Sequence, residues 1–150
     1  MRYLNLKKIV LSVFVASLFT ACGGGSSSTS TSSDSGTDGI AVDPYISDAT
    51  FFWDKNKNGI HDSTEPISSK SDASGKFSFT QEIPSGERIV MKDKGTHNGV
   101  PYTGTLSANL GANGVVSPLT TLEVTYENAD VVSMLNSAGI TISSDDIHKD

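Results

Sequence analysis

A twelve-residue stretch from Asp54 to Glu65, DKNKNGIHDSTE, constrains the fold of this chain more than any other feature. Side chains that carry oxygen recur through it, and they belong to Asp54, Asn56, Asn58, Asp62 and Glu65. Gly59 stands among them and can adopt the positive φ of a sharp bend. Pro66 follows directly, and the residue before a proline avoids helical geometry. We therefore expect a tight polar loop from which no helix leaves.

The spacing of these oxygens indicates a calcium site of EF-hand type. Calcium takes about six to eight oxygen ligands, which a short loop supplies by turning alternate side chains inward. Lys55, Lys57 and His61 fall only at the remaining positions. A solvated turn rich in Asp, Asn and Gly is the alternative, but it does not explain this separation. The predicted side-chain ligands are Asp54, Asn56, Asn58, Asp62 and Glu65, and the resemblance to known calcium loops implies the backbone carbonyl of Ile60 as a further ligand.

Short apolar runs separated by turn residues predict a mainly β domain around this loop. We expect strands within residues 40–46, 49–53, 67–71, 76–79, 86–93 and 101–110. Asp72 to Gly75 supplies turn chemistry between two of them, and Phe77 and Phe79 then alternate with polar residues. With 150 residues, 36% of them hydrophobic, the chain can build one small core. The expected architecture is a small β-sandwich over residues 39–116.

Residues 117–150 predict a short α-helical tail after the β domain. Ser117 is a helix cap and Pro118 suits the first helical position. A second helical run ends at Gly139, and a third begins near Ser143. Such short helices are marginal alone in water, so they must pack against other structure. We expect the tail to be incomplete as a folding unit, so that a chain ending near Val116 keeps the melting behaviour of the full chain.

The first residues indicate secretion and lipid attachment. Residues 1–21 have a basic start and an apolar run that is too short to span a membrane, as in a signal peptide. The stretch LFTAC, which ends at Cys22, resembles the lipobox of bacterial lipoproteins, although Phe19 stands where leucine is usual. The resemblance implies that Cys22 is the lipid-bearing N-terminus after cleavage. Residues 22–38 are rich in Gly, Ser and Thr, which is typical of a flexible tether.

Charge argues against one class of partner, and cysteine content excludes intramolecular disulfides. Three of the 11 basic residues and none of the 17 acidic residues lie within residues 1–21. The remaining eight basic and 17 acidic residues give the rest of the chain a net charge of −9, which argues against nucleic acid as a partner. Cys22 is the single cysteine, so no intramolecular disulfide can form. A structural cation is therefore favoured as a stabilising element.

Three stretches resemble modules of bacterial surface proteins. WDKNKNGIHDSTEP is similar to the calcium loop of SdrD-type B repeats in adhesins, and SDASGKFSF resembles the strand-turn-strand of prealbumin-like modules, also called Cna-B or carboxypeptidase-regulatory-like. VVSPLTTL is similar to a stretch that follows such modules in large Gram-negative lipoproteins. The resemblance covers about residues 40–122 and implies a prealbumin-like β-sandwich. The adhesin repeat has a further strand between its calcium loop and the following hairpin, and this chain is shorter in that segment. Dockerins carry paired loops followed by helices, which Pro66 and the single copy disfavour.

The sequence predicts an anchored scaffold and no enzyme. We find no HExxH and no G-x-S-x-G motif, and the clustered carboxylates belong to the calcium loop. Gly23 is not the aspartate that signals inner-membrane retention, so we expect the cell envelope at the outer membrane. The expected function is a structural or adhesive scaffold for a cell-surface protein or polysaccharide ligand. The alternative is an N-terminal fragment of a larger lipoprotein whose working domain, an adhesin or a polysaccharide-active enzyme, lies beyond residue 150.

Overall fold

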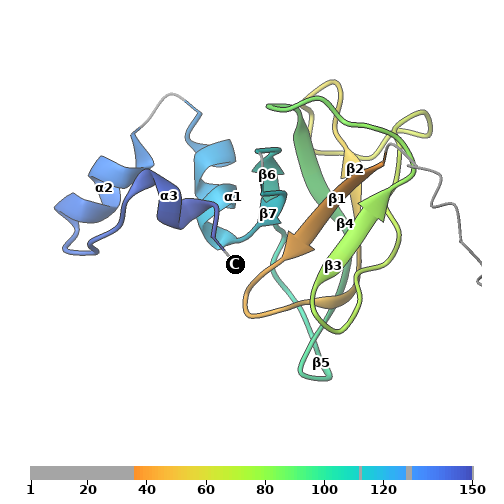
Figure 1. Ribbon diagram of the computed structural model, residues 1–150, viewed down its shortest axis with the longest axis horizontal. Helices are drawn as coiled ribbons and strands as arrows, with labels where there is room; N and C mark the ends of the chain where they lie inside the picture. The colour runs from red at the N-terminus through yellow and green to blue at the C-terminus, as the bar shows by residue number, and fades with distance from the viewer. Residues whose placement is uncertain (1–35, 112, 128–129, 150) are drawn as a thin grey trace, which may run out of the picture. The chain divides into compact units, whose positions relative to one another are not determined.

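The computed structural model describes residues 36–111, 113–127 and 130–149. Their fold is mainly β, with two sheets and three short helices, as the sequence predicts (Figure 1). The expected signal peptide, the Cys22 lipidation site and most of the tether lie outside the described residues. Within the described part of the chain, no helix combines the length and the apolar character needed to cross a membrane.

The first sheet has three strands in the order β3-β1-β7. Its strands are β1 (Thr37–Ala41), β3 (Lys76–Phe79) and β7 (Val115–Val116). β1 is antiparallel to β3 and parallel to β7. The Asp72–Gly75 turn before β3 forms as expected, because the Asp72 carbonyl accepts from the Gly75 N–H (3.0 Å) and its carboxylate accepts from the Ser74 N–H (2.8 Å).

The second sheet is built around one long strand. Its strands are β2 (Ser47–Trp53), β4 (Arg88–His97), β5 (Val100–Pro101) and β6 (Ser107–Asn109). β2, β5 and β6 all pair antiparallel with β4. The single strand expected over 101–110 is thus divided into β5 and β6, because the chain bends away from β4 around Gly104 before Leu106 accepts from the Met91 N–H (2.8 Å).

Residues 67–71 do not form the strand that the sequence predicts, apart from a bridge between Ile67 and Phe52. Two serine hydroxyls replace carbonyl oxygens as acceptors. Ser68 Oγ accepts from the Phe51 N–H (2.9 Å), and Ser71 Oγ accepts from the Ala49 N–H (3.0 Å). Ser69 instead donates to the Ser78 carbonyl at β3 (2.8 Å). The segment therefore joins β2 to β3 by alternating its partners between the two sheets, and this alternation prevents a regular ladder.

A single apolar core takes side chains from both sheets. Phe51 of β2 stacks on Phe77 of β3 with ring centroids 4.2 Å apart, and Phe79 meets Phe77 edge-on. A register shift between Thr50 and Phe51 lets β2 bury four consecutive residues, Ala49 to Phe52. β2 is therefore held on both faces, and its end at Trp53 is a rigid starting point for the loop that follows.

The first helix, α1 (Pro118–Thr125), packs against β6. Its N-terminus forms as predicted, with Ser117 as the cap and a reciprocal bond to Thr120. The buried Thr120 hydroxyl lies 2.9 Å from the Ser107 carbonyl oxygen of β6, and the Ser107 N–H donates to Thr121 Oγ1 (2.9 Å). A chain ending at Val116 would lose these bonds. These bonds argue against the expectation that such a chain keeps the melting behaviour of the full chain, which remains to be measured.

Two further helices follow, α2 (Val131–Ser137) and α3 (Ser144–Ile147). Asp130 caps α2 through the Ser133 N–H (3.0 Å), and Gly139 adopts a φ of +85° directly after the C-cap, as the sequence predicts. Val131 and Ile147 are buried, whereas the other residues of α2 and α3 are exposed or half-buried. Each helix thus contributes one side chain to the interior.

Candidate metal centre

The loop from Asp54 to Glu65 leaves the end of β2 and returns beside it. The Trp53 N–H donates to the Pro66 carbonyl (3.0 Å), and the Asp54 N–H donates to the Arg88 carbonyl at the start of β4 (2.9 Å). Both ends are therefore tied to the second sheet. No helix borders the loop on either side, which agrees with the expectation from Pro66.

Asp54 is the buried anchor of the loop, with a fully buried side chain. Its Oδ1 accepts from the Asn58 N–H (3.0 Å) and its Oδ2 from the Gly59 N–H (2.9 Å). Gly59 has a φ of +74°, a conformation that other residues rarely adopt. The carboxylate thus organises the first half of the loop by gathering its N–H groups.

The two asparagines continue the same pattern. Asn56 Oδ1 accepts from the Asn58 N–H (3.0 Å), and Asn58 Oδ1 accepts from the Ile60 N–H (2.7 Å). Each of these side chains caps the backbone two residues ahead, which is the Asx-turn geometry favoured by asparagine. The side-chain oxygens at alternate positions consequently turn toward the backbone that coils around them.

Glu65 closes the loop by folding back onto its start. Its side chain is buried, its Oε1 accepts from the Lys55 N–H (2.8 Å), and its Oε2 accepts from the Asp62 N–H (3.0 Å). A carboxylate oxygen can accept more than one bond, so both oxygens retain capacity for a cation. Asp62 Oδ2 in turn accepts from Asn56 Nδ2 (2.6 Å), which connects the two halves of the loop.

The basic side chains between these positions make contacts of their own, and His61 Nε2 lies 3.2 Å from the Glu65 carbonyl oxygen. Lys55 Nζ is 4.3 Å from the centroid of the Trp53 ring, a cation–π contact on the loop's outer side. His61 packs edge-on against Phe52 with ring centroids 5.3 Å apart. Lys57 is exposed and has a φ of +59°. The alternation in the sequence therefore corresponds to two different sets of surroundings in the folded loop.

Arg88 is the site residue that the sequence did not reveal. Its Nη2 lies 2.6 Å and its Nε 2.8 Å from Asp54 Oδ2, and its side chain is 12% exposed. Its Nη1 lies 3.9 Å from Glu127 Oε1, beyond the end of α1. The one available signal was that Arg88 is the only arginine outside the first 21 residues. Its partner at Asp54 is 34 residues away in the chain, so no local pattern identifies the pair.

The loop fits calcium in its donor set, although it is closed by its own bonds. All six predicted ligands lie in one loop, and four of the five side chains accept a loop N–H through oxygen. Asn56 presents its amide nitrogen to Asp62, because its oxygen is turned toward the Asn58 N–H. Among the described residues, no group of three or more His, Cys, Asp and Glu side chains is placed to hold a metal. The three carboxylates of the loop, Asp54, Asp62 and Glu65, are thus not placed together as a metal-holding group.

Comparison with known proteins gives no relative from which a role could be transferred. No family model, no curated protein and no solved structure matches this chain significantly.

Proposed function

We propose that this chain is a lipid-anchored protein of the cell envelope whose β module, stabilised by calcium, serves as a structural or adhesive scaffold. In this proposal the two sheets are a prealbumin-like sandwich of the kind found in SdrD-type surface proteins. Cys22 carries the lipid at the outer membrane, and the partner is a cell-surface protein or polysaccharide. No catalytic role is assigned, and nucleic acid is not a partner.

The observation that carries the calcium assignment is the buried Asp54 carboxylate at the end of a core strand, with loop N–H groups gathered on both of its oxygens. Glu65 is held in the same way from the other end of the loop. Calcium would be bound by these two carboxylates with Asn56, Asn58, Asp62 and the Ile60 carbonyl. It would neutralise the negative charge gathered there and tie β2 to the segment after Pro66.

A metal that binds only the folded loop stabilises the fold by mass action. Three carboxylates and two asparagines are typical of weak extracellular sites, with a Kd on the order of 10⁻⁴ M. At about 1 mM free calcium, such a site contributes roughly 1.4 kcal/mol to the free energy of unfolding. No hinged pair of helices adjoins the loop, so we expect stabilisation without a change of conformation elsewhere.

The first prediction follows: chelation lowers the melting temperature by several degrees and leaves a β-type far-UV spectrum. Differential scanning calorimetry with and without calcium measures the shift. Asp62→Ala removes an exposed carboxylate ligand and abolishes the shift. Asp54→Ala also abolishes it, and it destabilises the protein without metal because Arg88 loses its buried partner.

Lys55→Ala is the matched control, because it alters the same loop at an outward position. It should retain the full calcium-induced shift. If calcium changes neither the melting temperature of the wild-type chain nor the protection of the loop from proteolysis, the loop is only a polar turn and the calcium assignment is wrong.

A further inference from the structure

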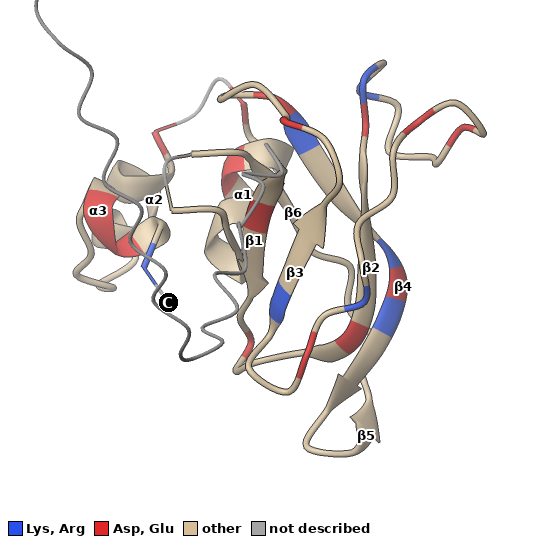
Figure 2. Ribbon diagram, turned by 45° about the vertical axis from the view of Figure 1, so that its right-hand side comes forward, with Lys and Arg blue, Asp and Glu red and all other residues tan. Residues whose placement is uncertain are grey.

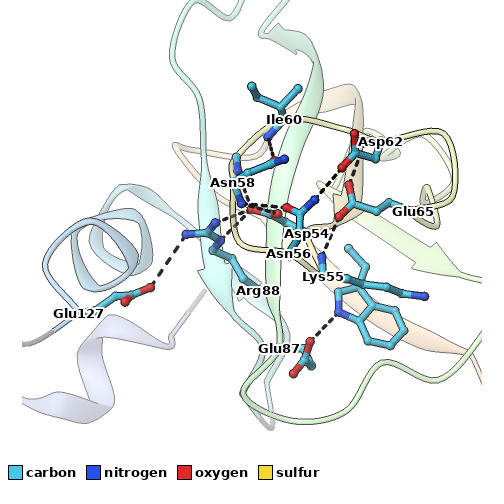
Figure 3. Close-up of polar contacts among 12 residues, drawn as sticks. Asp54, Lys55, Asn56, Asn58, Ile60, Asp62, Glu65, Glu87, Arg88 and Glu127 are labelled. Atoms are coloured by element: carbon cyan, nitrogen blue, oxygen red, sulfur yellow. Dashed lines mark hydrogen bonds and ion pairs between the residues drawn. The ribbon is translucent and has the colours of Figure 1, made fainter.

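The Arg88 guanidinium already provides a positive charge at the most buried carboxylate of the loop. Asp54 is fully buried, and Arg88 reaches it with two nitrogens at 2.6 and 2.8 Å. A buried carboxylate without a counter-charge would be strongly destabilising. The pair therefore gives the loop a cation of its own, supplied by β4 and not by the loop sequence (Figure 3).

The two oxygens of Asp54 are used unequally. Oδ2 accepts from Arg88 Nε and Nη2 and from the Gly59 N–H, whereas Oδ1 accepts from the Asn58 N–H alone. A calcium ion that used Asp54 would share this carboxylate with the guanidinium. Because both groups would lie close together and shielded from solvent, the repulsion between calcium and the guanidinium would weaken calcium binding strongly.

Arg88 also has a second carboxylate within reach. Glu127 Oε1 lies 3.9 Å from Arg88 Nη1, and the Glu127 side chain is 52% exposed. This contact is longer and more exposed to solvent than the bond to Asp54, so it is the weaker of the two. It nevertheless offers the guanidinium an acceptor on the side away from the loop when its hold on Asp54 weakens.

We propose that Arg88 is the residue that determines the calcium affinity of this loop: its guanidinium competes with calcium for Asp54 and holds the loop folded when calcium is scarce. The inference rests on the proposed calcium function and deepens it. Arg88 acts through Asp54 and does not itself bind metal. The loop thereby keeps its shape at low calcium, at the expense of weaker binding.

The test compares substitutions of Arg88 by isothermal titration with calcium chloride and by thermal melts in chelator. Arg88→Gln retains a hydrogen-bond donor and loses the charge, so its affinity for calcium should be higher than that of wild type by about tenfold or more. The same variant should melt at a lower temperature than wild type in chelator, and calcium should restore much of that loss. Arg88→Lys keeps the charge and loses the two-pronged contact, so its calcium affinity should stay within about threefold of wild type.

Lys92→Gln is the charge-matched control. Lys92 lies on β4 in the stretch Lys92–Lys94, where basic and acidic residues alternate (Figure 2). This stretch is exposed, and Lys92 Nζ lies 3.5 Å from Asp93 Oδ2. Removing its charge should change calcium affinity by less than about twofold, because exposed charges are screened by solvent and salt. A gain equal to that of Arg88→Gln would assign the effect to net charge and overturn the inference.

The remaining outcomes separate this inference from the calcium assignment. Equal calcium affinity in Arg88→Gln and wild type overturns the role of Arg88 while leaving the calcium site intact. Binding by Arg88→Gln together with no detectable binding by wild type supports both. No binding by either protein overturns both. If Arg88→Gln fails to fold even with calcium, Glu127→Gln is the deciding variant. It removes the second carboxylate near Arg88, so Asp54 becomes the only carboxylate that Arg88 contacts and calcium binding should weaken. Equal or tighter calcium binding would contradict the inference.

Discussion

At the scale of single residues, Tyr102 shows how a polar group acquires a role from its surroundings. It packs against the core, and its hydroxyl donates to Asp43 Oδ2 (2.8 Å). Loss of solvent and this bond to a carboxylate raise the pKa of Tyr102 from 10.0 to about 12. The hydroxyl therefore keeps its proton in the folded chain at a pH where it would lose it in the unfolded chain.

The second prediction concerns alkaline pH. Because the folded-state pKa of Tyr102 is raised, its contribution to stability is complete below pH 10 and is lost as the pH rises toward about 12. Absorbance titration of tyrosinate should show one late-ionising tyrosine that Tyr102→Phe removes. Asp43→Asn should move that ionisation toward pH 10. A titration in which Tyr102→Phe removes an ordinary tyrosine would contradict the assignment.

At the scale of elements, hydroxyl groups join α1 to β6. Thr120 is 1% exposed, and its hydroxyl bonds to the Ser107 carbonyl and to the Ser117 N–H (2.8 Å). Thr125 lies on the same helix, but its exposed hydroxyl bonds only to Thr121 one turn back. The two threonines therefore differ in whether they join α1 to β6.

The third prediction compares these threonines. Thr120→Val keeps the shape of the side chain and leaves buried backbone groups without a partner, so the free energy of unfolding should fall by about 1–3 kcal/mol. Thr125→Val should change it by less than about 0.5 kcal/mol. Urea unfolding of both variants measures the difference. Equal effects would mean that the Thr120 hydroxyl does not stabilise the contact between α1 and β6.

The elements that the sequence predicted are those specified by neighbouring residues. Pro66 excludes a helix after the loop, and Ser117 with Pro118 starts α1, because caps and prolines act within one turn. Residues 67–71 were predicted wrongly as a strand, since their partners lie on β2 and β3 and only tertiary structure shows that they alternate. Arg88 was missed for the same reason. Local chemistry could identify the donors of the loop, but not the distant charge that faces them.

At the scale of the whole molecule, membrane attachment and calcium binding would belong to separate parts of the chain. Cys22 and the loop are more than thirty residues apart in sequence, with the Gly/Ser/Thr-rich stretch between them. Attachment to the membrane and stabilisation by calcium should therefore respond to different substitutions, each without affecting the other.

The fourth prediction tests that separation. Several acyl chains on Cys22 would hold the protein firmly on a membrane, whereas a single chain holds it only marginally. Cys22→Ser should therefore move the protein from the membrane fraction to the soluble fraction after cell lysis, while its calcium-induced melting shift stays equal to that of wild type. Asp62→Ala should show the reverse, remaining with the membrane and losing the shift. Wild-type fractionation by Cys22→Ser would contradict the anchor, and a lost calcium shift in that variant would mean that the lipidated terminus and the loop are not independent.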